Sequence, residues 1–390
     1  MTGRLSGLIP AAGLSSRMRG FKPLYPLGQA TVIERVIALF RETGIADVIV
    51  VTGHRAGELE PVVRAAGARP VRNDRYEQGM FTSICTGVEA LDQDCSGFFL
   101  LPVDIPLVRP RTLARLAQAF AQSAPRIAYP VFLGERGHPP LISCGMIPAI
   151  LAAGQDPAHE GGLRPVLEAA EAREPGAVLD VPVADQFVLE DMDTEAAYAG
   201  LCSRFDSYAA PSGAECRALW DLAGTPGPVR DHCRAVARVA EALALAVNLR
   251  READKELDAA LIRSAALLHD AAKGRPGHEQ EGAALAREWG FAPLAPLIAA
   301  HRDFEPGTGP VPGEELVFLA DKVVAGARPL DMEERFGQAL ERFGHDPDAR
   351  EAILDRREHG RAARQRFEAE SGRDLMDLAN AALNTRGGES

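Results

Sequence analysis

The sequence predicts an α/β domain with a mostly parallel sheet, followed by an all-α domain. In the first half, short β-rich runs alternate with segments of helical periodicity, the order typical of β-α-β units. From about residue 214 onward, apolar residues recur at helical spacing and strand-like runs almost vanish. The length of 390 residues also favours two domains, since one domain usually takes about 100–200 residues.

The expected elements can be placed in order along the chain. Strands are expected at 5–12, 46–53 and 96–104, and helices at 31–44, 57–68 and 83–94. Each strand run ends in glycine, proline or aspartate, so the unusual residues fall at the carboxyl ends of strands, where open α/β sheets bind ligands. In the second half, helices are expected at 232–248, 256–273, 278–290, 315–327 and 350–371.

A Ser/Pro/Gly-rich stretch with one short helical piece separates the two halves. We therefore expect a first domain at 1–203, a linker with a short helix at 204–228, and a helical domain at 229–390. The chemistry-bearing residues of the helical domain fall within 230–330.

Composition excludes several classes of protein. Lys and Arg number 43 against 55 Asp and Glu, a net charge of −12, which disfavours duplex nucleic acid as a partner. The six cysteines form no C-x-x-C pairs, which argues for reduced thiols in the cytoplasm and against a zinc ribbon. We expect neither a signal peptide nor a membrane span, because the first apolar run is short and no run reaches 18 residues.

Small residues follow the first expected strand. Ala11, Ala12, Gly13 and Ser15 would let backbone N–H groups face phosphates, and the loop matches neither the P-loop nor the dinucleotide-binding pattern. Nearby Arg17 and Lys22 would neutralise a triphosphate; we list both as catalytic candidates. For Gly13 alone, a tight strand-to-helix turn remains the alternative.

Asp104 follows an apolar strand run and precedes Ile105-Pro106. A carboxylate at the carboxyl end of a strand is where Mg²⁺ on a triphosphate would bind, although a lone aspartate before a proline often only shapes a turn. Asp191 or Asp193 either completes the metal site or caps the helix that follows. Transfer to an acceptor phosphate needs charge neutralisation rather than a general base, so the lack of a catalytic histidine here is expected.

The segment AAG-x-S-x-R-M followed by Lys22 resembles the signature of MobA-like nucleotidyltransferases, although Arg19 stands where that family commonly has glycine. The segments EQGMFTSICTGVEAL, LLPVDIPLV and EDMDT resemble three further motifs of the family in the same order. The resemblance implies a Rossmann-like fold that moves a nucleoside monophosphate from an NTP to an acceptor phosphate and releases pyrophosphate. It places Gly79 and Ser83 near the nucleotide, and Asp104 and Asp193 at Mg²⁺, while Met80 and Phe81 are expected in the core.

The resemblance also implies which nucleotide and which acceptor the first domain uses. Ala11-Ala12-Gly13 is more similar to the cytidylyltransferase branch, which favours CTP, and GHPPLIS from Gly137 resembles the molybdopterin cytidylyltransferases, whose acceptor is the terminal phosphate of the molybdenum cofactor. His138 would contact that acceptor, or is simply a loop histidine beside two prolines. Two alternatives stay open: a sugar phosphate or another small phosphate or phosphonate as acceptor, and a delivery protein that hands the cofactor to a molybdenum hydroxylase.

Histidine and aspartate side chains recur on separate helices of the second half. His232, the pair His269-Asp270 and Asp321 could converge on a divalent metal in a helical core. Their order and the flanking text AALLHDAAK and FLADK resemble the HD-domain phosphohydrolase superfamily. His278 and His301 lie where members with two metals have extra ligands.

This second resemblance implies one or two divalent ions, Mn, Fe, Mg or Ni, that activate water for attack on a phosphoester. Lys273 would meet a substrate phosphate, or would complement a helix dipole. His345 and His359 fall in charged segments and are expected to be solvated.

Overall fold

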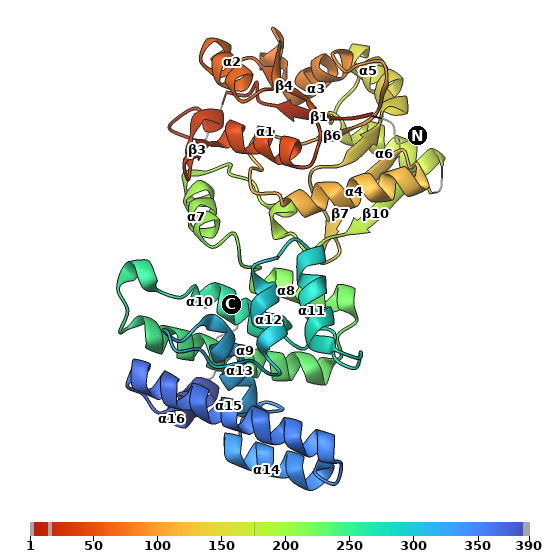
Figure 1. Ribbon diagram of the computed structural model, residues 1–390. Helices are drawn as coiled ribbons and strands as arrows, with labels where there is room; N and C mark the ends of the chain where they lie inside the picture. The colour runs from red at the N-terminus through yellow and green to blue at the C-terminus, as the bar shows by residue number, and fades with distance from the viewer. Residues whose placement is uncertain (1–3, 15–17, 175, 385–390) are drawn as a thin grey trace. The chain divides into compact units, whose positions relative to one another are not determined.

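The computed structural model describes residues 4–14, 18–174 and 176–384 (Figure 1). The chain folds into two compact units, Met1–Asp206 and Ser207–Ser390. Within the described ranges, no helix is both long and apolar enough to span a membrane.

The first unit is built on one mixed sheet with the strand order β10-β7-β9-β6-β1-β4-β5, and β8 pairs with β7. β1 pairs in parallel with β4 and β6, β4 with β5, and β7 with β10, whereas β8 and β9 run antiparallel to their neighbours. The mostly parallel sheet is therefore confirmed. The strands are β1 (Arg4–Pro10), β4 (Asp47–Thr52), β5 (Arg69–Arg72), β6 (Cys95–Leu100), β7 (Ile127–Phe132), β8 (Glu135–Arg136), β9 (Leu141–Ser143) and β10 (Val178–Pro182), with a separate hairpin of β2 (Pro26–Leu27) and β3 (Ala30–Thr31).

Helices cover both faces of this sheet (Figure 1). A Cβ on Gly7 would meet Phe40 of α1, and a Cβ on Gly87 of α3 would meet Leu8 of β1 at 2.3 Å. Because neighbouring strand residues face opposite sides, α1 and α3 pack closely on opposite faces. The helices are α1 (Val32–Glu42), α2 (Ala56–Ala65), α3 (Met80–Glu89), α4 (Pro110–Ser123), α5 (Ile147–Gln155), α6 (Arg164–Arg173) and α7 (Glu195–Asp206), with the 3-10 turns η1 (Lys22–Leu24), η2 (Tyr76–Gln78), η3 (Cys144–Met146) and η4 (Gln186–Leu189).

The second unit is helical, as expected, apart from a two-residue ladder of β11 (Val324–Ala325) and β12 (Arg328–Pro329). Its most extensively buried helix is α9, which packs against α10, α13 and α16. The helices are α8 (Gly213–Ala223), α9 (Gly227–Asn248), α10 (Ala259–Leu268), α11 (His278–Glu288), α12 (Leu294–Ala300), α13 (Gly313–Lys322), α14 (Met332–Phe343), α15 (Pro347–Ser371) and α16 (Leu375–Asn384), with the 3-10 turn η5 (Ala253–Lys255).

Helix α8 lies in the stretch that we expected to be a linker, and it packs within the second unit. A capping box between Ser212 and Glu215 starts the helix. The buried Trp220 indole donates a hydrogen bond to the Leu267 carbonyl of α10, 2.9 Å away. Residues 213–223 therefore pack against the helical core of the second unit and do not form an extended linker.

Candidate functional site

The first candidate site lies at the carboxyl ends of the central strands of the first unit. Lys22 Nζ lies 2.5 Å from Asp193 Oδ1 and 3.6 Å from Asp104 Oδ2. Asp104 comes four residues after β6, Asp193 two residues before α7, and Lys22 begins η1. Three segments far apart in sequence thus bring two carboxylates to one ammonium group.

Backbone hydrogen bonds hold the closing segment in place. Met192 N donates to the carbonyl of Asp104 at 2.9 Å, and Asp193 N donates to Asp191 Oδ1 at 3.2 Å. Helix α7 takes its cap from Thr194, whose hydroxyl accepts from Ala197 N. The Asp193 carboxylate therefore faces Lys22, while Thr194 caps α7.

Burial raises the pKa of Asp104, and Asp193 raises it further, while the charge of Lys22 acts in the opposite direction. A nearby cation stabilises the ionised form of a partly buried carboxylate of this kind. Carboxylate oxygens are also the ligands that Mg²⁺ prefers. The Asp104 and Asp193 side chains fit such an ion in both charge and donor type.

The loop after β1 differs between its two ends. Ala11 and Ala12 are buried, and the Ala11 amide donates to the Val51 carbonyl, so it is used inside the sheet. Gly13 is exposed, and a Cβ placed on it would meet nothing within 4 Å. Ser15 and Arg17 lie outside the described residues.

The segment around Gly79 and Ser83 is fixed by a residue that the sequence did not single out. Asn73 Nδ2 donates to Ser83 Oγ at 3.0 Å and to Thr82 Oγ1 at 2.9 Å. Ser83 is buried, whereas Gly79, with φ of 105°, is open to solvent at the start of α3. Asn73 follows β5 directly, and this position at a strand end was the signal that could have identified it.

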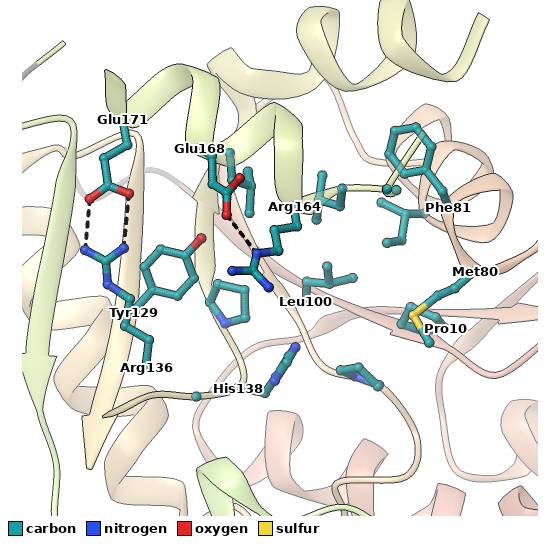
Figure 2. Close-up of a pocket in the computed structure, with 18 residues that line it drawn as sticks. Pro10, Met80, Phe81, Leu100, Tyr129, Arg136, His138, Arg164, Glu168 and Glu171 are labelled. Atoms are coloured by element: carbon teal, nitrogen blue, oxygen red, sulfur yellow. Dashed lines mark hydrogen bonds and ion pairs between the residues drawn. The ribbon is translucent and has the colours of Figure 1, made fainter. Parts of the chain in front are cut away.

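A cavity of about 680 Å³ opens beside these strand ends (Figure 2). Pro10, Met80, Phe81, Leu100, Tyr129 and His138 are among its lining residues. The expectation that Met80 lies in the core is wrong, because its side chain lines the cavity and is 57% exposed. Phe81 also lines the cavity, with its ring centroid 5.1 Å from that of His159.

The far wall of the cavity is polar, and the charges of its lining residues balance because Arg164 also pairs with Glu168, at 2.7 Å. Arg136 forms two hydrogen bonds to Glu171, at 3.0 and 3.1 Å, and a second pair to Asp180 (Figure 2 draws the Glu171 contacts). Its guanidinium also lies 4.9 Å from the Tyr129 ring centroid. Burial lowers the pKa of His138, which keeps the imidazole neutral. The wall thus suits a polar body without net negative charge.

The second candidate site is a cluster of histidine and aspartate side chains in the second unit. Two groups share Asp270, and the possible ligand atoms within each group lie within 4.8 Å of one another. Asp321 Oδ1 adds to the first group, 3.1 Å from His232 Nε2 and 3.7 Å from His269 Nε2. The groups are His232, His269 and Asp270, and Asp270, His278 and His301.

The histidines are oriented by backbone carbonyls. His269 Nδ1 lies 2.7 Å from the Ala266 carbonyl, His301 Nδ1 2.6 Å from that of Ile298, and His232 Nδ1 3.1 Å from that of Gly326. Since a carbonyl only accepts, each Nδ1 carries the proton and each Nε2 presents its lone pair to the cluster. His269 Nε2 is buried without a hydrogen-bond partner. This donor set fits one or two divalent ions.

Charges around the cluster favour its metal-binding protonation state. Burial lowers the pKa of His269, so the imidazole stays neutral. Burial opposes ionisation of Asp321, but Lys322 and Arg335 hold the pKa of that carboxyl well below its usual range. Neutral imidazoles and ionised carboxylates are the forms that bind metal.

Several cations lie beside these carboxylates. Lys273 Nζ contacts Asp270 Oδ2, and Lys322 Nζ lies 2.7 Å from Asp321 Oδ2. Arg335 Nη1 donates to the Asp321 carbonyl at 2.6 Å, and its Nη2 lies 3.4 Å from Asp321 Oδ1. Arg335 belongs to α14, outside the region of 230–330 in which we expected the chemistry, and no pattern in the sequence marked it.

The two remaining histidines of this unit differ. His345 is exposed in the turn before α15, as expected. His359 is partly exposed, and its Nδ1 lies 2.9 Å from Asp303 Oδ1 at the surface.

Two family models match separate parts of the chain. Residues 7–174 match the MobA-like NTP transferase domain, and residues 229–326 match the HD domain. The first match includes Lys22 and Asp104, and the second includes every histidine and aspartate of the cluster. Helices α14, α15 and α16 lie beyond the second match.

Individual proteins are similar to the first unit. The molybdenum cofactor cytidylyltransferase of Escherichia coli K12 is 28% identical over 187 residues, 46% of this chain and 92% of that protein. The bifunctional protein GlmU of Gloeobacter violaceus is 30% identical over 133 residues, 33% of this chain and only 29% of that protein. Among solved structures, a nucleotidyl transferase from Methanothermobacter thermautotroptrophicus is 25% identical with a TM-score of 0.45, covering 52% of this chain and 98% of that one.

Proposed function

Because the chain joins a MobA-like NTP transferase domain to an HD domain, we propose that it is a bifunctional enzyme. The first unit transfers CMP from CTP to the terminal phosphate of the molybdenum cofactor, and the second is a metal-dependent phosphohydrolase. The observation that carries the transferase proposal is the meeting of Lys22 with Asp104 and Asp193 beside a large cavity at the strand ends. Open α/β sheets bind ligands at this edge.

In the proposed transfer, an oxygen of the acceptor phosphate bonds to the α-phosphorus while the bond to the bridging oxygen breaks and pyrophosphate leaves. Lys22 and Arg17 offset the charge of the triphosphate. Mg²⁺ held by Asp104 and Asp193 would neutralise the departing pyrophosphate. Ala11, Ala12, Gly13, Ser15, Gly79 and Ser83 form the proposed nucleotide-binding segments.

The cavity is proposed to hold the body of the acceptor. The charged side chains that line it balance, Arg136 with Glu171 and Arg164 with Glu168, which suits a polar body, and the acceptor phosphate would then point toward Lys22. The similarity to the E. coli molybdenum cofactor cytidylyltransferase, across 92% of that protein, favours this cofactor. A sugar phosphate or another small phosphate remains the second candidate.

In the proposed hydrolysis, a water oxygen bonds to phosphorus as the bond from phosphorus to the ester oxygen breaks; the water gives up a proton to solvent, and the departing oxygen takes one up and leaves as an alcohol. His232, His269, Asp270 and Asp321 would hold one ion, and Asp270, His278 and His301 a second. Ions of this kind lower the pKa of bound water. The single observation that supports this proposal is His269 Nε2, a buried acceptor without a partner.

We also propose domain limits of 1–203 for the transferase and 229–390 for the HD domain, with α8 of the stretch between them packed on the HD domain, and a cytoplasmic location. The six cysteines form no disulfide, which agrees with a reducing compartment.

The transferase proposal is tested by incubating the full chain with Mg²⁺, labelled CTP, GTP, ATP or UTP, and molybdenum cofactor, a sugar phosphate or no acceptor. Labelled cytidylylated cofactor formed only from CTP supports the proposal. Transfer to the sugar phosphate alone supports the second candidate. Tight binding of the cofactor without transfer from any nucleotide supports a delivery protein for a molybdenum hydroxylase.

A further inference from the structure

His278 is oriented differently from the other histidines of the cluster. The Nδ1 atoms of the other three face backbone carbonyls, whereas His278 Nδ1 lies 3.4 Å from the carboxylate oxygen Oε2 of Glu279. On the other side of the ring, His278 Nε2 lies 3.3 Å from Asp270 Oδ1 and 3.3 Å from His301 Nε2. Each ring nitrogen of His278 therefore faces a carboxylate, and only Nε2 faces the cluster.

The Glu279 carboxylate is held beside this ring by an ion pair. Glu279 follows His278 in the first turn of α11, and its Oε1 accepts a hydrogen bond from Arg302 Nη1 at 3.3 Å. Arg302 directly follows His301 at the end of α12. The ion pair thus joins the two segments that carry His278 and His301, and the Glu279 side chain is only 17% exposed.

The second oxygen of the same carboxylate lacks a donor. Within the part of the chain that the structure describes, Glu279 Oε2 is buried and makes no hydrogen bond. Its distance to His278 Nδ1 is about 0.5 Å longer than a formed charge-assisted hydrogen bond. Because a buried carboxylate oxygen without a donor is unfavourable, a proton on His278 Nδ1 would stabilise it.

We propose that Glu279 is a positioning residue that holds the ring proton of His278 on Nδ1 and so leaves Nε2 free to bind the second divalent ion. The inference rests on the proposed metal-dependent hydrolase. A neutral imidazole carries one proton, and Asp270 at Nε2 competes for it with Glu279 at Nδ1. Without Glu279 the proton would lie between Nε2 and Asp270, on the nitrogen that the ion needs. Carboxylates that accept from the outer nitrogen of a metal-binding histidine commonly set its tautomer.

The first test is ¹⁵N NMR of the His278 ring in the metal-free full chain at pH 8, where an ordinary imidazole is neutral. The natural protein is compared with E279A, E279Q and the control E281A, and H278A assigns the signals. Glu281 is an exposed acidic residue of the same helical turn, so E281A removes the same charge from the start of α11. We expect E279A to shift the ring toward the Nε2–H tautomer and E281A to leave it unchanged. E279Q should fall between, because an amide oxygen accepts but carries no charge.

The second test is calorimetric titration of Mn²⁺ into the same proteins and R302A. We expect two ions in the natural protein. E279A should raise the Kd of one ion about 10- to 100-fold, the usual effect of losing a group that orients a ligand, and should leave the other ion unchanged. E279Q should recover part of this loss, and E281A should match the natural protein. R302A keeps the carboxylate and should raise the Kd less than E279A does.

An unchanged His278 tautomer in E279A overturns the inference. So does an R302A effect on the Kd as large as that of E279A, because the ion pair between the helices would then explain the loss. A natural protein that binds only one ion also overturns the inference but leaves the hydrolase proposal standing. A natural protein that binds no divalent ion overturns both. If E279A does not fold, E279Q gives the decision by the same criteria.

Discussion

Lys22 Nζ and Asp193 Oδ1 lie 2.5 Å apart although 171 positions of sequence separate them. This contact joins the loop after β1 to the segment before α7 and places one ammonium group beside two carboxylates. We expect K22A to lower the rate of nucleotidyl transfer about 100- to 1000-fold, the usual effect of removing one charged group that stabilises a transition state. The rate is measured as labelled product formed from CTP, with K255A, an exposed lysine of the second unit, as control.

The ionised carboxylate of Asp104 serves the proposed metal site but lowers the stability of the first unit. Because its pKa is raised by burial, the folded state binds a proton more tightly than the unfolded chain does, and stability falls as pH rises through the folded pKa. At pH 7.5, D104N should therefore abolish transfer yet raise the melting temperature of the first unit, by about 2–4 °C for each kcal/mol gained. Calorimetry without Mg²⁺ measures this; a lower melting temperature for D104N contradicts the account.

Asp270 belongs to both groups of possible ligands, whereas His232 and His278 belong to one each. Metal content after Mn²⁺ loading and desalting should therefore be about two ions for the natural protein, about one for H232A or H278A, and close to none for D270A. H345A, which changes an exposed histidine, is the control. Equal metal content in D270A and H345A would show that the cluster does not hold the ions.

Much of the fold and of the two candidate sites was predictable from the sequence, because their signals lie in residues that are neighbours along the chain. Asp104 and Gly13 were found because each closely follows an apolar strand run, and the His269-Asp270 pair because it ends an apolar helix. Contacts such as Arg136 with Asp180, or Arg335 with Asp321, depend on how distant elements pack, and nothing near those residues in sequence indicates a partner. Met80 was misplaced because its apolar side chain lines a cavity rather than the core.

His138 lines the cavity, and the partial removal of its ring from water should keep it neutral at physiological pH. Its pKa is lowered by burial from the usual 6.5. Below pH 6.5 the unfolded chain therefore takes up a proton that the folded state does not, and stability falls toward acid. NMR titration of the His138 ring should give a midpoint below 6.5, and H138Q should reduce the loss of stability between pH 6.5 and 5.5. A His138 midpoint above 6.5 contradicts this.

Arg335 joins α14 to the end of α13 through hydrogen bonds to the carbonyls of Asp321 and Val324. R335A should lower the free energy of unfolding of the second unit by about 1–3 kcal/mol, because buried acceptors lose a charged donor. Urea unfolding followed by the fluorescence of Trp220 and Trp289, which both lie in the second unit, measures this change, and R342A, on the same helix, is the control. Equal midpoints for R335A and R342A would argue against this role.

If the chain carries two separate active sites, each activity can be removed without the other. Labelled CMP transfer and p-nitrophenyl phosphate hydrolysis are measured on the natural protein, D104A and H269A. We expect D104A to lose transfer and keep hydrolysis, and H269A to lose hydrolysis and keep transfer. Transfer by D104A at the natural rate, or hydrolysis by H269A at the natural rate, would contradict it.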